Sequence, residues 1–442
     1  MEAVIDNDAV KVQQILKNDP TVNINFRDAK GRTPLIAASN NDHGLAVHTL
    51  LLQAGANVNF EDNSGQTALL TSLYTNWWHC ESDIAESLLS KNIDINHQNK
   101  NGDTALIIAT QVCSDTNLFK KIITLGAKIN TQNNSGRTAL MNSFWGATDI
   151  FGLLLALGAD PNLKTNKGET VLHLACNDAD LSEQVYDQKI NLLLEAKVDV
   201  NAVTNTGMTP LMAFAYNRQY AQTQKLISHG AKVNAADVDG ETVLTYAAFG
   251  PRDDVTILKL LVDAGANINQ LNKNGETVLV KLLTTEDPWN QIKRDGEEVE
   301  FLINSGATLN VTLKKDKEPL LIYAIRNRLR NTTAAMINKG ADLNVWTNFG
   351  VQSALGQAVS NGDGGAFVDL FISHHANLEI QDAFGTPLIR ACSSMGGAAI
   401  VKKLLEAGAN VHAVDSGGYS SLDIATRYGY FDIVALLRKW GG

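Results

Sequence analysis

One stretch of this sequence, residues 28–59, recurs with variation along all 442 positions, and it constrains the fold more than any other feature. It contains in order a turn segment, a short apolar run, a second apolar run and a closing segment: Gly31-Arg32-Thr33-Pro34-Leu35, Ala37-Ala38, Leu50-Leu51-Leu52 and Gly55-Ala56-Asn57-Val58-Asn59. Glycine permits the positive φ of a tight turn, threonine caps free backbone N–H groups, and proline suits a first helical turn. We therefore expect each repeat to form a turn, two helices and an extended return.

A single repeat of this kind leaves one apolar side uncovered, so it must stack on a copy of itself. The copies are marked by a leucine that follows the capping position at intervals of about 33 residues. These leucines are Leu35, Leu69, Leu106, Leu140, Leu172, Leu211, Leu244, Leu279, Leu320, Leu355, Leu388 and Leu422. Stacking them would give one continuous core instead of several globular domains.

Two short motifs accompany the leucines. The turn motif is clearest at Thr33-Pro34-Leu35, Thr209-Pro210-Leu211, Thr386-Pro387-Leu388 and Thr170-Val171-Leu172-His173, and the closing motif at 55–59, 158–162, 230–234, 265–269 and 340–344. The pattern resembles the ankyrin repeat family, whose T-P-L-H-x-A signature recurs every 33 residues or so. The resemblance covers essentially the whole chain. It implies an all-α solenoid, a curved stack of about 13 helix-turn-helix repeats with hairpin-like turn tips.

The sequence predicts four segments in this array. They are an N-terminal capping repeat at 1–27, a main array at 28–310, irregular C-terminal repeats at 311–427 and a C-terminal capping helix at 428–442. Alignment puts Met1 inside a first helix, so the first repeat is either a shortened cap or follows residues removed from the natural chain. In the tenth repeat, Asp316 and Glu318 occupy the places of the turn glycine and the capping threonine, which predicts a weak joint there.

Charge and motif content exclude several functions. The net charge is −10, from 37 basic and 47 acidic residues, so we expect no nucleic-acid partner. No stretch of apolar residues is long enough to cross a bilayer, so we expect no membrane insertion. The sequence has no H-E-x-x-H, C-x-x-C, G-x-S-x-G or P-loop motif, and we therefore predict no catalytic residues, cofactor or metal. An enzyme whose site is carried by the loops at 76–82 and 284–297 is the alternative.

The four cysteines are too sparse for a disulfide framework. Cys80 and Cys113 fall in loops of successive repeats, where a bridge is conceivable if the protein is exported, whereas Cys176 and Cys392 read as buried thiols. The localisation stays open between a cytoplasmic and an exported or periplasmic chain. The resemblance implies that His173, at the histidine of the family signature, makes a structural hydrogen bond to a neighbouring turn.

The resemblance also implies a protein-binding concave face formed by turn tips and first helices. Its variable late-helix position is occupied by Asn40, Tyr74, Gln111, Trp145, Asp178, Tyr216, Phe249, Thr284, Ile325, Ser360, Ser393 and Arg427, and the long loops add Trp77, Trp78, Tyr186 and Trp289. Clustered exposed aromatic side chains often dominate interface energies. We therefore predict an aromatic protein-binding patch within residues 70–290, made by Tyr74, Trp77, Trp78, Trp145, Tyr216, Phe249 and Trp289. Alternatively, these rings fill space between helices or under their own loops.

The sequence thus favours a non-enzymatic protein–protein interaction module, monomeric when free, that binds, scaffolds or inhibits a protein partner of unknown identity. Acidic turn tips, such as those at Glu61, Asp62 and Asp103, fit a basic partner surface. The alternative is a bacterial immunity or inhibitor protein, or a secreted effector, that acts by binding an enzyme or a host protein.

Overall fold

The computed structural model describes residues 1–19, 21–40, 44–73, 82–112, 115–176, 181–251, 255–285, 295–314, 317–347, 350–361, 365–394 and 397–442. These residues contain 26 helices, and their extended pairing consists of isolated β-bridges at turn tips, such as Glu61 with Thr67. The helices alternate between a first and a second helix of each repeat. The all-α solenoid predicted from the sequence is confirmed.

The first helices carry odd numbers. They are α1 (Glu2–Ile5), α3 (Pro34–Ala38), α5 (Ala68–Leu73), α7 (Ala105–Val112), α9 (Ala139–Ser143), α11 (Val171–Ala175), α13 (Pro210–Tyr216), α15 (Val243–Ala248), α17 (Val278–Thr284), α19 (Leu320–Arg326), α21 (Ala354–Ser360), α23 (Pro387–Cys392) and α25 (Ser421–Tyr428). The second helices are α2 (Ala9–Asn18), α4 (Leu45–Gln53), α6 (Ser82–Leu89), α8 (Thr116–Thr124), α10 (Thr148–Ala156), α12 (Glu183–Glu195), α14 (Tyr220–Ser228), α16 (Val255–Asp263), α18 (Glu297–Asn304), α20 (Arg330–Asn338), α22 (Ala366–Ser373), α24 (Ala398–Glu406) and α26 (Phe431–Lys439).

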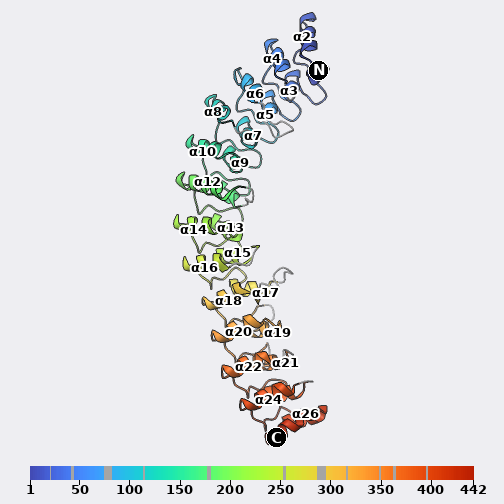
Figure 1. The fold of residues 1–442 in the computed structure, drawn as a ribbon, viewed down its shortest axis with the longest axis vertical. Helices are drawn as coiled ribbons and strands as arrows, with labels where there is room; N and C mark the ends of the chain where they lie inside the picture. The colour runs from blue at the N-terminus through green and yellow to red at the C-terminus, as the bar shows by residue number, and fades with distance from the viewer. Residues whose placement is uncertain are drawn as a thin grey trace. The chain divides into compact units, whose positions relative to one another are not determined.

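The chain divides into two compact units. Unit 1 comprises residues 1–214 and 221–232, and unit 2 comprises residues 215–220 and 233–442. Within each unit, the first helices follow one another along one side and the second helices along the other (Figure 1). Each repeat therefore contributes the same two kinds of surface to its unit.

The turn that opens a repeat forms as its residues predict. Gly31 has a φ of +78°, and the Thr33 hydroxyl accepts a hydrogen bond from the Ile36 N–H at 3.3 Å. A Cβ on Gly31 would lie 2.8 Å from the backbone nitrogen of Asn63 in the next turn. Glycine is thus required here twice, for the backbone conformation and for the close approach of the next repeat.

An asparagine ladder joins the closing segments of successive repeats. The Asn59 side chain accepts a hydrogen bond from the Asp94 N–H at 2.9 Å and donates one to the Asn92 carbonyl at 3.1 Å. The same acceptor role recurs at Asn96, Asn130, Asn162, Asn201, Asn234, Asn269 and Asn310. Asparagine suits this place because its amide both donates and accepts, which saturates backbone groups that helix packing leaves open.

From α4 to α26, every second helix buries the residues at positions i, i+1 and i+4, which we call the core triplet; some of these helices bury further residues, and α2 buries Val12 alone. In α4 the core triplet is Val47, His48 and Leu51. Its first member is Ile84, Leu118, Ile150, Lys189, Gln222, Ile257, Glu298, Thr332, Phe367, Ile400 or Ile433 in the helices from α6 to α26. This position is thus mostly apolar, and the charged exceptions, Lys189 and Glu298, are as deeply buried as the apolar members.

The tenth repeat departs from the expected alignment by one residue. Its turn is closed by a hydrogen bond from Leu313 N–H to the Glu318 carbonyl, five residues on, instead of four as in the first turns. The N-cap of α19 is consequently Pro319, and the alignment of Glu318 with the capping threonine was wrong. Ile325 is buried, and Arg326 takes the late-helix position. The weak joint near residue 310, and the segment boundaries, stay predictions.

Candidate functional site

The candidate binding surface is built from the residue seven places after the N-cap of each first helix. Trp145 and Tyr216 hold this position and are 36% and 42% exposed, while Phe249 is half-buried. Trp145 belongs to unit 1, and Tyr216 and Phe249 to unit 2. Tyr74, Trp77, Trp78 and Trp289 lie outside the described residues, as do Cys80 and Cys113.

In unit 1, Trp145 rests on a buried aromatic cluster. Its ring meets that of Phe144 edge to face, with centroids 5.8 Å apart, and Phe144 packs in the same way on Phe151 at 5.6 Å. The Arg137 guanidinium lies 5.6 Å from the Trp145 ring centroid and donates a hydrogen bond to the Asn142 side chain at 3.3 Å. The indole thus has one supported side and one exposed side, which suits a contact residue.

A buried lysine fixes the loop that carries Trp145. The Lys189 ammonium donates hydrogen bonds to the carbonyl oxygens of Phe144 and Gly146, the latter at 2.6 Å. It also lies 5.5 Å from the Phe144 ring centroid and 5.7 Å from that of Phe151. The two carbonyl groups stand on either side of Trp145 in the chain.

In unit 2, Tyr216 and Phe249 lie on adjacent repeats that approach closely. A Cβ on Gly250, the residue after Phe249, would be 2.5 Å from the Tyr216 carbonyl oxygen. The Lys281 ammonium lies 5.5 Å from the Phe249 ring centroid and pairs with Glu241 at 2.6 Å. This part of the surface therefore presents two rings beside a neutralised cation.

Sequence reasoning missed a second row of candidate contact residues, four places after the N-cap. Tyr246, Lys281 and Tyr323 occupy it in unit 2. Burial and the hydrogen bond to Asp237, at 2.8 Å, raise the pKa of Tyr246, and Tyr323 donates to the Leu283 carbonyl at 3.2 Å. The residues four and seven places after the N-cap are three positions apart, so both rows lie on one helix face. This spacing is the sequence signal that would have identified the second row.

A buried ion pair holds the loop after Tyr216. The Arg218 guanidinium bonds the Glu298 carboxylate, and the two side chains are only 4% and 3% exposed. Arg218 adopts a φ of +60°, and its side chain passes so close to Gly250 that a Cβ there would lie 2.9 Å from Nε. One ion pair therefore connects repeats separated by eighty residues, within unit 2.

One predicted aromatic residue was misplaced. Tyr186 was expected on an exposed loop, but it lies in α12, is buried, and donates to the Ala175 carbonyl at 3.1 Å. The inserted loop ends earlier because α12 begins at Glu183 with Ser182 as its N-cap. For Tyr186, the alternative in which aromatic rings fill space is therefore correct.

The buried histidine and thiols have the structural roles that were expected. His173 Nε2 lies 3.1 Å from the Met208 carbonyl of the next turn, and burial lowers its pKa. Cys176 and Cys392 are buried and unbridged, and burial raises the pKa of Cys392 to about 12. Both ring nitrogens of His173 are engaged, Nε2 by the Met208 carbonyl and Nδ1 by the Thr170 N–H, and burial disfavours the thiolate of Cys392.

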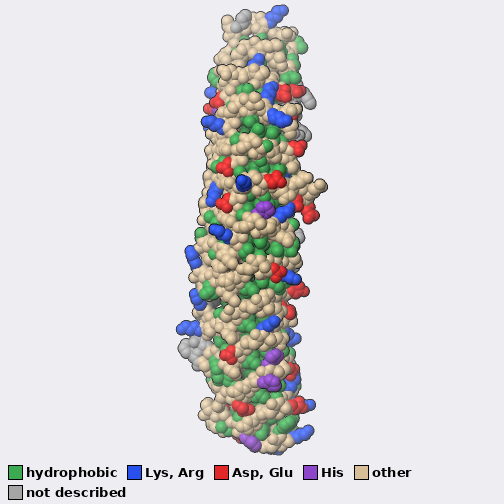
Figure 2. Space-filling view, turned by 90° about the vertical axis from the view of Figure 1, so that its left-hand side faces the viewer, with side chains coloured by type: hydrophobic (Ala, Val, Ile, Leu, Met, Phe, Trp, Pro, Cys, Tyr) green, Lys and Arg blue, Asp and Glu red, His purple; other side chains and the backbone are tan. Residues whose placement is uncertain are grey.

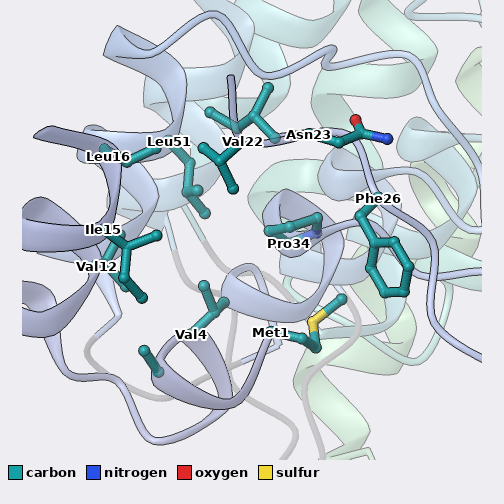
Figure 3. A pocket seen from close by; sticks show the side chains of 12 residues that line it. Met1, Val4, Val12, Ile15, Leu16, Val22, Asn23, Phe26, Pro34 and Leu51 are labelled. Atoms are coloured by element: carbon teal, nitrogen blue, oxygen red, sulfur yellow. The ribbon is translucent and has the colours of Figure 1, made fainter. Parts of the chain in front are cut away.

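A pocket of about 290 Å³ opens at the first repeat of unit 1 (Figure 3). Its lining comes from α1, α2, the return segment and the next repeat, and is almost wholly apolar; the labelled residues are Met1, Val4, Val12, Ile15, Leu16, Val22, Asn23, Phe26, Pro34 and Leu51. Ile15 is exposed here, whereas its counterpart Leu51 is buried beneath the preceding repeat. With Asn23 as the polar residue of this lining, the pocket lacks converging catalytic groups.

The described ranges contain no cluster of three or more His, Cys, Asp or Glu side chains that could hold a metal ion. Across the same ranges, no helix is both long and apolar enough to span a bilayer.

Comparison with known proteins agrees with this architecture. A family model described as ankyrin repeats (3 copies) matches residues 1–99, 76–165, 179–272 and 355–441. The chain therefore belongs to the ankyrin repeat family. Among curated proteins it is similar to an ankyrin repeat protein of fowlpox virus (strain NVSL), with 32% identity over 146 residues, and to one of Acanthamoeba polyphaga mimivirus, with 32% identity over 106 residues.

These matches are partial on both sides. They cover 31% and 22% of this chain, and the chain spans 42% and 16% of the lengths of those two relatives. What the relatives share with this chain is thus a run of repeats, and ankyrin repeats generally mediate protein–protein interaction.

Proposed function

We propose that this chain is a non-enzymatic binding protein that engages a protein partner through the first-helix faces of its units and is monomeric when free. The observation that carries the proposal is the exposure of Trp145 and Tyr216 at one variable position. The fold does not need a large ring there, because Asn40 and Ser360 hold the same position in other repeats. Exposed aromatic side chains on a rigid scaffold are the usual anchors of protein interfaces.

Charge contributes to the choice of partner. Figure 2 draws the second-helix side, opposite the proposed binding face, and there acidic and basic side chains are interspersed among hydrophobic ones. Two cations beside rings of this face are paired with carboxylates, Lys281 with Glu241 and Arg326 with Glu318 at 2.8 Å, whereas Arg137 beside Trp145 bonds the neutral Asn142 side chain. The acidic turn tips then favour a partner with a basic rim around an apolar centre. Inhibition of an enzyme or of a host protein is the alternative to scaffolding, and the identity of the partner would distinguish them.

An affinity capture tests the proposal. Immobilised wild-type chain is compared with the double variant Trp145→Ala/Tyr216→Ala and with a matched control, Asn40→Ala/Ser360→Ala, which changes polar residues at the same position. We expect a specific protein bound by wild type and control and released from the double variant, with circular dichroism equal in all three. A partner retained by the double variant would place the site elsewhere, and no specific partner for the wild type would contradict the proposal.

A further inference from the structure

The first position of the core triplet has an unusual distribution of charge. Val47, Ile84, Leu118 and Ile150 are apolar there, and Gln222 and Thr332 are polar but neutral, whereas Lys189 and Glu298 are charged and fully or nearly fully buried. Burial of a charge costs free energy unless hydrogen bonds and counter-charges offset it. A charged residue at a position that suits isoleucine therefore needs a reason besides packing.

Both exceptions reach back to a loop that carries a candidate contact residue. Lys189 bonds the carbonyl oxygens of Phe144 and Gly146, the residues on either side of Trp145. Glu298 bonds Arg218, which lies two residues after Tyr216. Two repeats in different units thus use the same helix position to tie down the loop that follows a first helix ending in an exposed ring.

The contacts restrict the loops in ways that apolar packing does not. Two hydrogen bonds from one ammonium fix the orientation of both peptide groups next to Trp145, and with them the direction of its side chain. In unit 2, Arg218 has a φ of +60°, a conformation that is uncommon for residues other than glycine. The loop is further confined by Gly250, whose missing side chain leaves room for Arg218.

We propose that Lys189 and the Arg218–Glu298 pair are positioning groups that hold loops 144–147 and 216–218 ready to present Trp145 and Tyr216 to a protein partner. The inference rests on the proposed function. Preorganisation of this kind raises affinity because the loops lose less conformational freedom on binding. Lys189 and Glu298 themselves are buried and make no contact with the partner.

The positioning is measured first without any partner. Hydrogen exchange and fluorine NMR of fluorotryptophan-labelled chain are compared for wild type, Lys189→Met and Lys189→Arg, with the Trp145 signal assigned from Trp145→Phe. Lys11→Met is the matched control, because Lys11 holds the corresponding position in α2 but is exposed. We expect exchange in 144–147 to rise by about tenfold and the Trp145 signal to shift or broaden in Lys189→Met. The arginine variant should restore both in part, and the control should change neither.

For unit 2, the double variant Arg218→Met/Glu298→Leu replaces the ion pair by apolar groups, so that the fold is kept while the loop is released. We expect faster exchange at 216–218 and unchanged exchange in α16. Unchanged exchange at both loops in folded variants would overturn the proposal. So would a change spread evenly over the unit, which would assign these groups to stability alone.

Binding then separates this inference from the proposed function. With the protein captured by the wild type as probe, Lys189→Met should raise Kd by about tenfold, and should add little when Trp145 is already alanine. Additive losses would overturn positioning while leaving the binding site in place. If Trp145→Ala has no effect on Kd but the loop measurements hold, the positioning is correct and the proposed site is wrong.

Discussion

Unit 1 and unit 2 bury charged or titratable groups at corresponding places but surround them differently. In unit 1, Lys189 faces carbonyl oxygens and aromatic rings, whereas in unit 2 Glu298 faces the guanidinium of Arg218. Among the described residues, removing the lysine leaves carbonyl oxygens and aromatic rings behind, whereas removing the glutamate leaves a buried guanidinium. The cost of deleting a buried charge therefore depends on what remains in the protein.

The largest effect should follow from Glu298→Leu alone. It takes the carboxylate away from Arg218, so we expect a loss of about 3–5 kcal/mol in the free energy of unfolding. Urea denaturation with hydrogen exchange resolved by unit would place the loss in unit 2. The double variant Arg218→Met/Glu298→Leu should recover most of it, and a double variant as unstable as the single one would contradict this explanation.

Acidification should weaken unit 1 before unit 2. His48 is buried in α4 with a pKa lowered by burial from 6.5 to about 4, and His173 shifts in the same direction. The folded state binds fewer protons than the unfolded state, so stability is full above pH 6.5 and is lost as the pH falls from 6.5 towards 4. For His48 the loss approaches about 3 kcal/mol.

In contrast to His48 and His173, the unit 2 histidines His374, His375 and His412 are exposed. Unfolding followed at several pH values should show the acid loss in unit 1 and its reduction by His48→Leu, since leucine holds the same core-triplet position at Leu258. Equal acid sensitivity of the wild type and this variant would count against the assignment.

A smaller effect is expected for Lys189→Met. Two carbonyl groups lose a charged donor, while the apolar stem is kept and the cost of burying the ammonium disappears, so we expect a loss of about 1–3 kcal/mol. The midpoint of urea unfolding for unit 1 is the measurement. If Lys189→Met lowered the free energy of unfolding as much as Glu298→Leu does, the different surroundings of the two buried charges would have no effect on stability.

The smallest effects belong to the exposed rings. Trp145→Ala and Tyr216→Ala should each change the free energy of unfolding by less than about 1 kcal/mol, because these side chains are substantially exposed. The matched core change Phe144→Ala should cost about 3–5 kcal/mol. A large loss for Trp145→Ala would make this ring part of the core instead of a contact residue.

The fold could be predicted from the sequence because the same kinds of turn, capping and apolar residues recur from repeat to repeat. Thr33 and Gly31 act as predicted, and errors occurred where an individual repeat varied its turn. An extra turn residue around Lys317 moves the N-cap of α19 to Pro319. The spacing of the leucines does not reveal this change, because Leu320 keeps its place in the repeat while the helix begins one residue later.

The candidate site was less readable than the fold. Trp145 and Tyr216 are exposed at the variable position, as expected, and their role in binding stays a prediction. Tyr186 was wrongly assigned to a loop, because the length of α12 depends on an N-cap, Ser182, beside an irregular insertion. The roles of Lys189 and Glu298 depend on partners 43 and 80 residues away. The local sequence pattern shows only that a charged residue replaces an apolar one in the core triplet. The role of that residue depends on tertiary contacts, which the local pattern does not contain.

The asparagine ladder has a consequence for how such a chain changes length. Each asparagine of the ladder links its own closing segment to the next, so these joints share the same pair of interacting groups, whereas Glu379 takes the acceptor role towards Asn410. Duplication or deletion of one entire repeat leaves each ladder asparagine facing the kind of backbone group that it normally binds. A breakpoint at any other interval places the asparagine amide opposite a different backbone group. The array can therefore gain or lose entire repeats, and recombination between its copies would yield folded products when the exchanged segment is one whole repeat.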